Sequence, residues 1–255
     1  MQAGMSLKTN GLLRLMGKEH LSNLEDYISA SLQESYLEIS SKEDIYNTFS
    51  NIINTFISSL SDDERIILRL YTGYDFRGIN SLLRGIWDYE LNGKLTEEVI
   101  NKYKDLCNDL ELIINRFPKP NINFKVYRGV DIKPFYEYGI YTIEELVNMK
   151  DKYYYESGFT STSLLRDTSF YYNKSEWSNN SNIEIEYYIP KESEDGALLL
   201  TDDLSYSKEQ NEYLINSGSL FKIIDVKIED NKAYLKAILI PKKIWNIVLE
   251  TKLKR

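Results

Sequence analysis

The spacing of apolar residues changes once along this sequence, at Pro118 and Pro120. Before the prolines, apolar residues recur three or four positions apart, which predicts amphipathic helices. After Phe124, short runs alternate between apolar and polar residues, as in the segment 183–189 (IEIEYYI), which predicts strands with one solvated face. Because helices come first and strands follow, the order favours an α+β fold over alternating βαβ units.

Local signals set the expected element boundaries. The segment 61–64 (SDDE) is a capping-box sequence, and Thr96-Glu97-Glu98 predicts a second helix start. An apolar stripe then runs from Val99 to Phe117, where the prolines end the helix. A short helix is expected over 142–152 and a hairpin turn over 229–232. The expected strands are 124–130, 155–164, 183–190, 196–200, 211–216, 220–229 and 233–241.

Composition excludes several function classes. The chain has one cysteine, Cys107, and one histidine, His20, so no intrachain disulfide forms and the residues do not favour a Cys-His or Ser-His-Asp hydrolase or a zinc protease. We expect Cys107 to be a buried apolar residue, His20 to lie on a helix surface, and no metal site. The net charge of −8 disfavours nucleic-acid partners.

The sequence shows no membrane-crossing segment. No run of about 18 apolar residues occurs, so we expect no membrane span. Lys and Arg interrupt the short apolar runs of the first twenty residues, so we recognise no secretory signal peptide.

Three short motifs follow one another on the expected strands: Tyr127-Arg128-Gly129, the segment 159–163 (FTSTS) and Gln210-Asn211-Glu212. Taken singly, they read as a surface arginine, a cluster of strand hydroxyls and a solvated carboxylate. In this order and on strands, they resemble the arginine-serine-glutamate class of bacterial mono-ADP-ribosyltransferase toxins. Upstream, the helical segment 71–84 is similar to the helix that borders the NAD pocket in clostridial and bacillary members. The Gln-x-Glu pair most resembles that of the clostridial Rho-modifying exoenzymes.

The resemblance implies a fold and a domain division. It covers residues 61–255 and implies an ADP-ribosyltransferase fold, in which N-terminal helices pack on a β-sandwich core of two antiparallel-rich sheets. Residues 61–255 would form the catalytic domain, and residues 1–60 an N-terminal helical extension that is surplus to it. We expect this extension to dock a separate transport component or a delivery system. The enzyme would be secreted, or delivered into the host cytosol.

The resemblance also implies NAD as co-substrate, without a metal. Cleavage of its glycosidic bond leaves positive charge near C1′ of the ribose, which Glu212 is expected to stabilise while accepting a hydrogen bond from the 2′-OH. Ser161 would hold Glu212 in place. Arg128 would clamp the pyrophosphate with its fork of donors. Gly129, which lacks a side chain, would let backbone groups approach the nicotinamide carboxamide.

Gln210 indicates which kind of protein side chain accepts the ADP-ribose. It stands two residues before Glu212, so on a strand both side chains would share one face. A neutral amide pairs with another amide through one donor and one acceptor, so we expect an Asn or Gln acceptor in a host protein, with a Rho-family GTPase as the best guess. The alternatives are an arginine-specific, actin-type transferase, a non-catalytic docking half of a binary toxin, and a glycohydrolase that uses water.

The remaining candidates are contacts to NAD or to the acceptor. Phe170 is expected to cover the nicotinamide, and Tyr206 to recognise the protein acceptor. Asn80 and Arg84 stand one helical turn apart and are expected to reach adenosine and phosphate. Tyr71 belongs to the same segment beside the NAD pocket.

Overall fold

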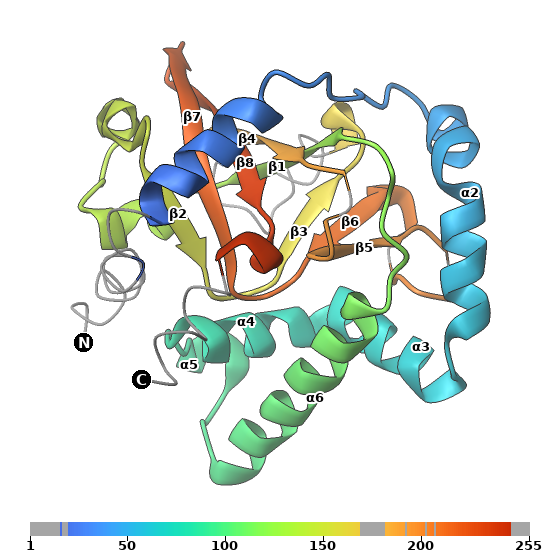
Figure 1. Cartoon of the computed structure of the whole chain (residues 1–255). Coiled ribbons are helices and arrows are strands. Elements are labelled where there is room, and N and C mark those ends of the chain that lie inside the picture. Colours follow the sequence, from blue (N-terminus) through green and yellow to red (C-terminus); the bar gives the residue numbers. More distant parts are fainter. Residues whose placement is uncertain are drawn as a thin grey trace.

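A computed structural model describes residues 16, 20–168, 182–191, 193–201, 203–206 and 208–245. Within these ranges, helices pack around an eight-stranded mixed sheet, so the expected α+β architecture is confirmed (Figure 1). None of the described helices has the length and apolar character that a bilayer crossing requires. The strands are β1 (Phe124–Val130), β2 (Tyr153–Glu156), β3 (Thr160–Ser163), β4 (Ile183–Ile189), β5 (Gly196–Leu199), β6 (Glu212–Ile215), β7 (Ser219–Glu229) and β8 (Lys232–Ile240).

The helices begin where the capping signals predict. Ser61 accepts a hydrogen bond from the Glu64 N–H and Glu64 reciprocates, which starts α3 (Asp62–Leu70). Thr96 caps α6 (Glu97–Asn115), in which Cys107 is buried as expected; burial raises its thiol pKa to about 12. The other helices are 20–31, α2 (Lys42–Ser59), the π-helix η1 (Tyr71–Asp75), α4 (Phe76–Arg84), α5 (Tyr89–Asn92), and the 3₁₀ helices η2 (Lys133–Tyr138), η3 (Glu144–Met149) and η4 (Lys208–Gln210). Residues 166–168 and 242–245 are also helical.

The strands form one sheet in the order β2-β7-β8-β4-β1-β3-β6-β5. Only β4 and β8 pair in parallel; the other pairings are antiparallel. The two sheets implied by the resemblance are joined where Tyr127 of β1 pairs with Ser163 of β3, so hydrogen bonding makes them one sheet. The expected hairpin between β7 and β8 is confirmed, because Asp230 and Asn231 both take positive φ values, 48° and 60°.

One expected strand is divided. The sequence predicts a strand over 155–164, but the structure has β2, a turn and then β3. The Gly158 N–H donates to the Glu156 carboxylate and the Phe159 N–H to the Asn80 side chain. Because side chains take both N–H groups, they cannot join a strand ladder. This turn leads directly into β3, which carries Ser161.

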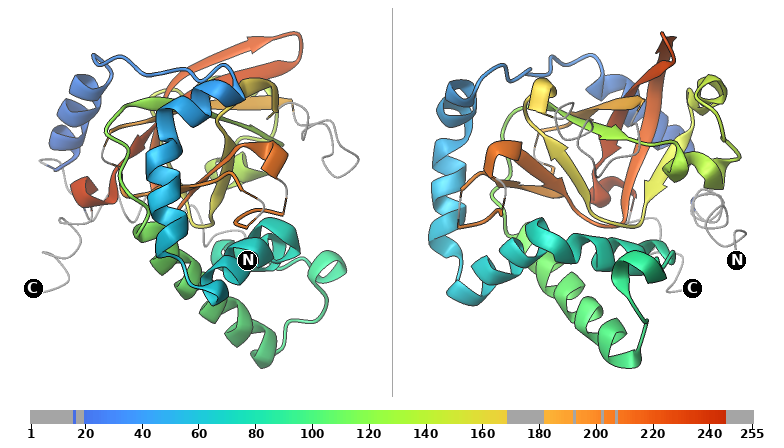
Figure 2. Two further views of the ribbon diagram at one scale, coloured as in Figure 1. Left: turned by 90° about the vertical axis from the view of Figure 1, so that its right-hand side faces the viewer. Right: turned by 180° about the vertical axis from the view of Figure 1, so that it is seen from behind.

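Residues before position 60 pack against the sheet. One face of α2 buries Ile45, Phe49, Ile53 and Phe56 in the same core as Phe124 of β1. Figure 2 shows α2 running along the sheet beside β5 and β6. The helix 20–31 covers β7 and β8, where Leu24 and Ile28 join a second apolar cluster with Leu220, Ile238 and Trp245 (Figure 1). A catalytic domain that starts at residue 61 stays a prediction.

Replacing Phe49 tests whether α2 is integral to this core. Phe49 is fully buried and meets Phe124 edge to face, with 5.4 Å between ring centroids. We expect Phe49→Ala to lower the free energy of unfolding by about 3–5 kcal/mol, because it removes ring burial and leaves a cavity. Tyr46→Ala, at a 69% exposed position of the same helix, is the control and should change it by less than about 0.5 kcal/mol. Equal urea midpoints for Phe49→Ala and wild type would contradict an integral α2.

Candidate functional site

The three sequence motifs lie on three neighbouring strands. Arg128 is on β1, Ser161 on β3 and Glu212 on β6, and β3 lies between the other two. Ser163 pairs with Glu212 across β3 and β6, and with Tyr127 across β3 and β1. The sheet therefore brings together residues that are far apart in the chain.

Glu212 is a buried carboxyl group with a perturbed pKa. Its exposed fraction is 2%, and burial raises its pKa to about 7, although the hydrogen bond with Ser161 and the charge of Arg128 act in the opposite direction. Its Oε2 atom has no hydrogen-bond partner among the described residues. A buried acceptor oxygen without a donor is suited to a hydroxyl donor from a bound ligand.

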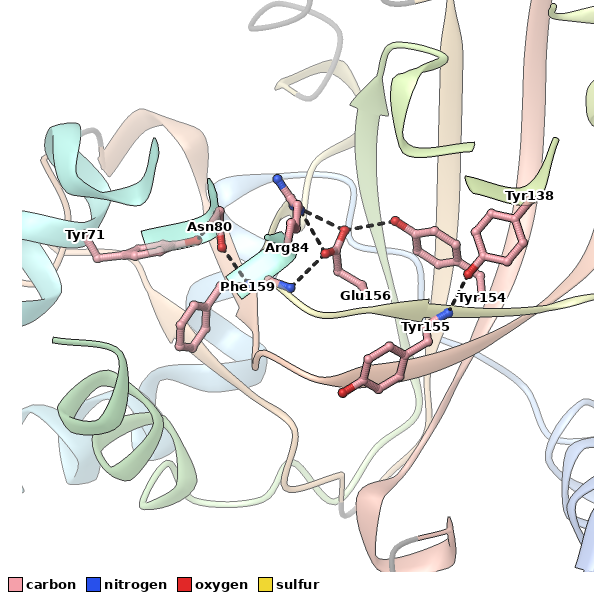
Figure 3. Close-up of polar contacts among 9 residues, drawn as sticks. Tyr71, Asn80, Arg84, Tyr138, Tyr154, Tyr155, Glu156 and Phe159 are labelled. Carbon is pink, nitrogen blue, oxygen red and sulfur yellow. Dashed lines mark hydrogen bonds and ion pairs between the residues drawn. The ribbon is translucent and has the colours of Figure 1, made fainter. Parts of the chain in front are cut away.

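Hydrogen bonds connect Asn80 of helix α4 to Tyr71 and to the turn before β3 (Figure 3). The Asn80 side chain donates to the Tyr71 hydroxyl at 3.3 Å and accepts from the Phe159 N–H at 2.8 Å. Tyr71 also hydrogen-bonds Ser161. Burial, and then the nearby Glu212 carboxyl group, raise the Tyr71 pKa, so its hydroxyl stays protonated at neutral pH. Tyr71 and Asn80 thus position Ser161 and the turn before it.

Arg84 extends from α4 into a bidentate ion pair. Its Nε and Nη2 atoms donate to the two oxygens of Glu156 at 2.9 and 3.2 Å. Glu156 is 6% exposed and also accepts from the Tyr154 hydroxyl at 2.9 Å and the Gly158 N–H at 2.8 Å. Glu156 is not among the residues predicted from the sequence. The available signal was an acidic residue in the aromatic run 153–156 (YYYE), directly before the FTSTS motif.

Gln210 does not lie on a strand, so the prediction that it shares a strand face with Glu212 is wrong. Gln210 ends the 3₁₀ helix η4, and Asn211 has φ 48°, in the left-handed region, so β6 begins only at Glu212. Alternation along a strand therefore does not place Gln210 on the face of Glu212. Gln210 still lies beside the carboxyl residue in the chain, and its role stays a prediction.

Three further candidates from the sequence are Tyr206, Gly129 and Phe170. Tyr206 is 62% exposed, and its ring lies against Tyr74 with 6.1 Å between centroids. Its N–H donates to the Thr72 hydroxyl at 2.9 Å, which ties this segment to the π-helix η1.

Gly129 lies on β1 opposite Glu184, and Phe170 falls outside the described residues. No cluster of three or more His, Cys, Asp or Glu side chains that could hold a metal lies within the described ranges.

The pKa of Glu212 predicts how activity depends on pH. If the carboxylate form stabilises a cation, the protonated form is inactive, so kcat/KM should fall about tenfold for each pH unit below about 7. Above that pH the profile should level off, because the group is then ionised. Initial rates of nicotinamide release at low NAD concentration measure this profile. A flat profile between about pH 5.5 and 8 would show that Glu212 does not act as a carboxylate.

The comparisons with known proteins decide the family. A family model described as ADP-ribosyltransferase exoenzyme matches residues 22–244. The chain therefore belongs to the ADP-ribosyltransferase exoenzyme family. It is an ADP-ribosyltransferase that uses NAD as co-substrate. No curated protein sequence matches the chain.

Solved structures of other ADP-ribosyltransferases share the fold. C3stau2 from S. aureus, solved with NAD, has a TM-score of 0.62 and 19% identity, over 82% of this chain and 100% of that one. The Clostridium limosum C3 exoenzyme has a TM-score of 0.59 and 20% identity, over 82% and 98% of the two chains. The enzymatic component C2-I of the Clostridium botulinum C2 toxin has a TM-score of 0.58 and 21% identity, over 81% of this chain and 50% of that one.

The described residues fit NAD. The site of this ADP-ribosyltransferase offers guanidinium groups suited to phosphate oxygens at Arg128 and Arg84. The unpartnered Glu212 oxygen offers an acceptor for a ribose hydroxyl. Both kinds of group are needed to bind a dinucleotide whose glycosidic bond is cleaved.

Proposed function

We propose that this ADP-ribosyltransferase transfers ADP-ribose from NAD to an Asn or Gln side chain of a host protein, with a Rho-family GTPase as the best candidate. The observation that most supports this proposal is the Gln210-Asn211-Glu212 motif, in which an amide side chain precedes a buried carboxyl group. An amide side chain recognises another amide by a reciprocal pair of hydrogen bonds. The fold shared with two C3 exoenzymes agrees with this motif.

The proposed mechanism gives each motif one task. Arg128 binds the pyrophosphate, and Glu212 accepts the 2′-OH hydrogen bond and stabilises positive charge at C1′. The bond between C1′ and the nicotinamide nitrogen breaks, and its electron pair leaves with nicotinamide. The acceptor amide nitrogen then bonds to C1′ and loses a proton to solvent water. Ser161 keeps the carboxylate oriented through their hydrogen bond.

The alternatives differ in what receives the sugar. An arginine acceptor is better served by a carboxylate at position 210, which this chain lacks. Water as acceptor would make the protein an NAD glycohydrolase, and we propose this as a side activity. A non-catalytic docking half of a binary toxin would not need the Arg128, Ser161 and Glu212 constellation that this chain retains.

Labelled NAD and a host-cell lysate test the proposal. Incubation with the full chain should label a protein of small-GTPase size, and mass spectrometry of that band should find ADP-ribose on Asn or Gln. Label on arginine would favour the actin-type alternative. Nicotinamide release without a labelled protein would indicate a glycohydrolase, and NAD binding with neither result would indicate a docking protein.

Delivery into the host cell is part of the proposal. The similarity to the enzymatic component of the C2 toxin supports a separate transport component, because C2-I is one part of a toxin. Only one face of α2 is buried in the core, so its other face remains available to such a partner. Binding of the transport component should then depend on exposed α2 residues such as Tyr46.

A further inference from the structure

The Glu156 carboxylate is a buried charge near the site that the mechanism above does not use. It lies at the end of β2, where it accepts hydrogen bonds from Arg84, Tyr154 and Gly158. Burial alone would raise the pKa of Glu156, but the charge and hydrogen bonds of Arg84, the charge of Arg128 and the Gly158 N–H together lower it. Glu156 is therefore an anion at neutral pH.

Its position links it to the candidate site. The charge of Arg128 lowers the pKa of both Glu156 and Glu212, so Arg128 lies near both buried carboxyl groups. Glu156 also faces Arg84, which gives it a guanidinium group on each of two elements, α4 and β1. Two such cations repel each other where water is scarce, and an anion close to both offsets that repulsion.

The ion pair leaves part of Arg84 free. Glu156 takes the Nε and Nη2 donors, and the third nitrogen, Nη1, forms no hydrogen bond with a described residue. Figure 3 shows a terminal nitrogen of Arg84 pointing away from Glu156. A guanidinium group held on one edge can bind a phosphate oxygen with its remaining N–H groups without first losing its rotational freedom.

We propose that Glu156 is a positioning residue for NAD binding: it fixes the Arg84 guanidinium so that the remaining N–H groups of Arg84 can bind a phosphate oxygen. It contacts neither the reacting bond nor the acceptor, so it acts on NAD affinity and leaves the chemical step to Glu212. The inference rests on the proposed cleavage of NAD in this site.

Glu156→Gln is the substitution that isolates this role. The glutamine carbonyl still accepts the Gly158 N–H and fills the same volume, but it cannot form a bidentate ion pair with Arg84. We expect the KM for NAD, from nicotinamide release by the full chain, to rise about tenfold with kcat changed less than about threefold, because a charged hydrogen-bond pair is lost. An unchanged KM, or a fall in kcat alone, would overturn the proposal.

Glu25→Gln is the matched control. Glu25 forms an ion pair with Lys222 and accepts from the Tyr153 hydroxyl at 2.7 Å, just as Glu156 pairs with Arg84 and accepts from Tyr154. The helix 20–31 carries Glu25 outside the candidate site. Glu25→Gln should leave KM and kcat within about twofold of wild type. A tenfold rise in KM for this control as well would show that the effect of Glu156→Gln is a general loss of an ion pair.

A double-substitution cycle shows whether Glu156 acts through Arg84. The double variant Arg84→Gln/Glu156→Gln should have the same KM as Arg84→Gln alone. If the two residues acted independently, the fold-increases in KM of the two single variants would multiply. The double variant removes both charges, so it leaves no unpaired buried ion and is expected to fold even if a single variant does not. In that case a wild-type KM for the double variant would overturn the proposal.

Calorimetric titration of NAD separates this inference from the proposed function. If wild type binds NAD but releases no nicotinamide, the proposed function fails, and the affinities of wild type and Glu156→Gln still decide the role of Glu156. If wild type releases nicotinamide and both bind NAD equally, only the inference fails.

Discussion

Glu212→Gln is expected to reduce nicotinamide release by about 100- to 1000-fold, the largest loss of activity from any single substitution in this site. The glutamine retains the size of the side chain, so NAD should bind with nearly unchanged affinity. It carries no charge at any pH, however, and cannot stabilise the cation at C1′. The measurement is single-turnover nicotinamide release at about pH 8, where the wild-type carboxyl group is ionised.

The same substitution should stabilise the fold, which distinguishes lost chemistry from lost structure. The Glu212 pKa is about 7 in the folded protein and 4.5 ordinarily, so between these pH values the unfolded chain loses a proton that the folded state keeps. The contribution of Glu212 to the free energy of unfolding of wild type is fully present below pH 4.5. It is lost as the pH rises through 7, and the total loss is about 3 kcal/mol. Glu212→Gln avoids this loss and should unfold at higher urea concentration than wild type at pH 8. Reduced activity together with reduced stability would contradict this account.

Gln210→Ala is expected to separate transfer from NAD cleavage. Loss of the amide should reduce labelling of the protein acceptor about 100-fold, because the acceptor nitrogen is no longer held near C1′. Nicotinamide release into water should stay within about threefold of wild type, since Glu212 and Arg128 are intact. The ratio of labelled protein to released nicotinamide measures this separation.

Gln210→Asn provides the control for the amide itself. It keeps a donor and an acceptor on a side chain one carbon shorter, so it should retain more transfer than Gln210→Ala. Equal transfer by wild type and Gln210→Ala would show that Gln210 does not recognise the acceptor. A parallel loss of nicotinamide release would instead assign Gln210 to NAD cleavage.

Local patterns predicted the elements that depend on nearby residues. The observed bounds of β1 match the expected strand 124–130. The capping box at Ser61 placed the start of α3, because its hydrogen bonds join residues three positions apart. The order of the three motifs also predicted the family, which the matching family model confirmed.

The features that were missed depend on contacts between distant residues. The Phe159 N–H bonds to Asn80, 79 positions away, and Glu156 bonds to Arg84, 72 positions away. Neither contact is readable from local spacing, so the division between β2 and β3 and the role of Glu156 needed the structure. For Gln210, the left-handed backbone of Asn211 interrupted the alternation that the strand argument assumed.

The most direct test of the central claim is a crystal structure of the full chain with an uncleavable NAD analogue. The account predicts that the unpartnered Oε2 atom of Glu212 accepts a hydrogen bond from the ribose 2′-OH, at about 2.6–3.0 Å. It also predicts that Arg128 contacts the pyrophosphate. An analogue bound with its ribose away from Glu212, or a Glu212 side chain turned away from Arg128 and Ser161, would contradict the account.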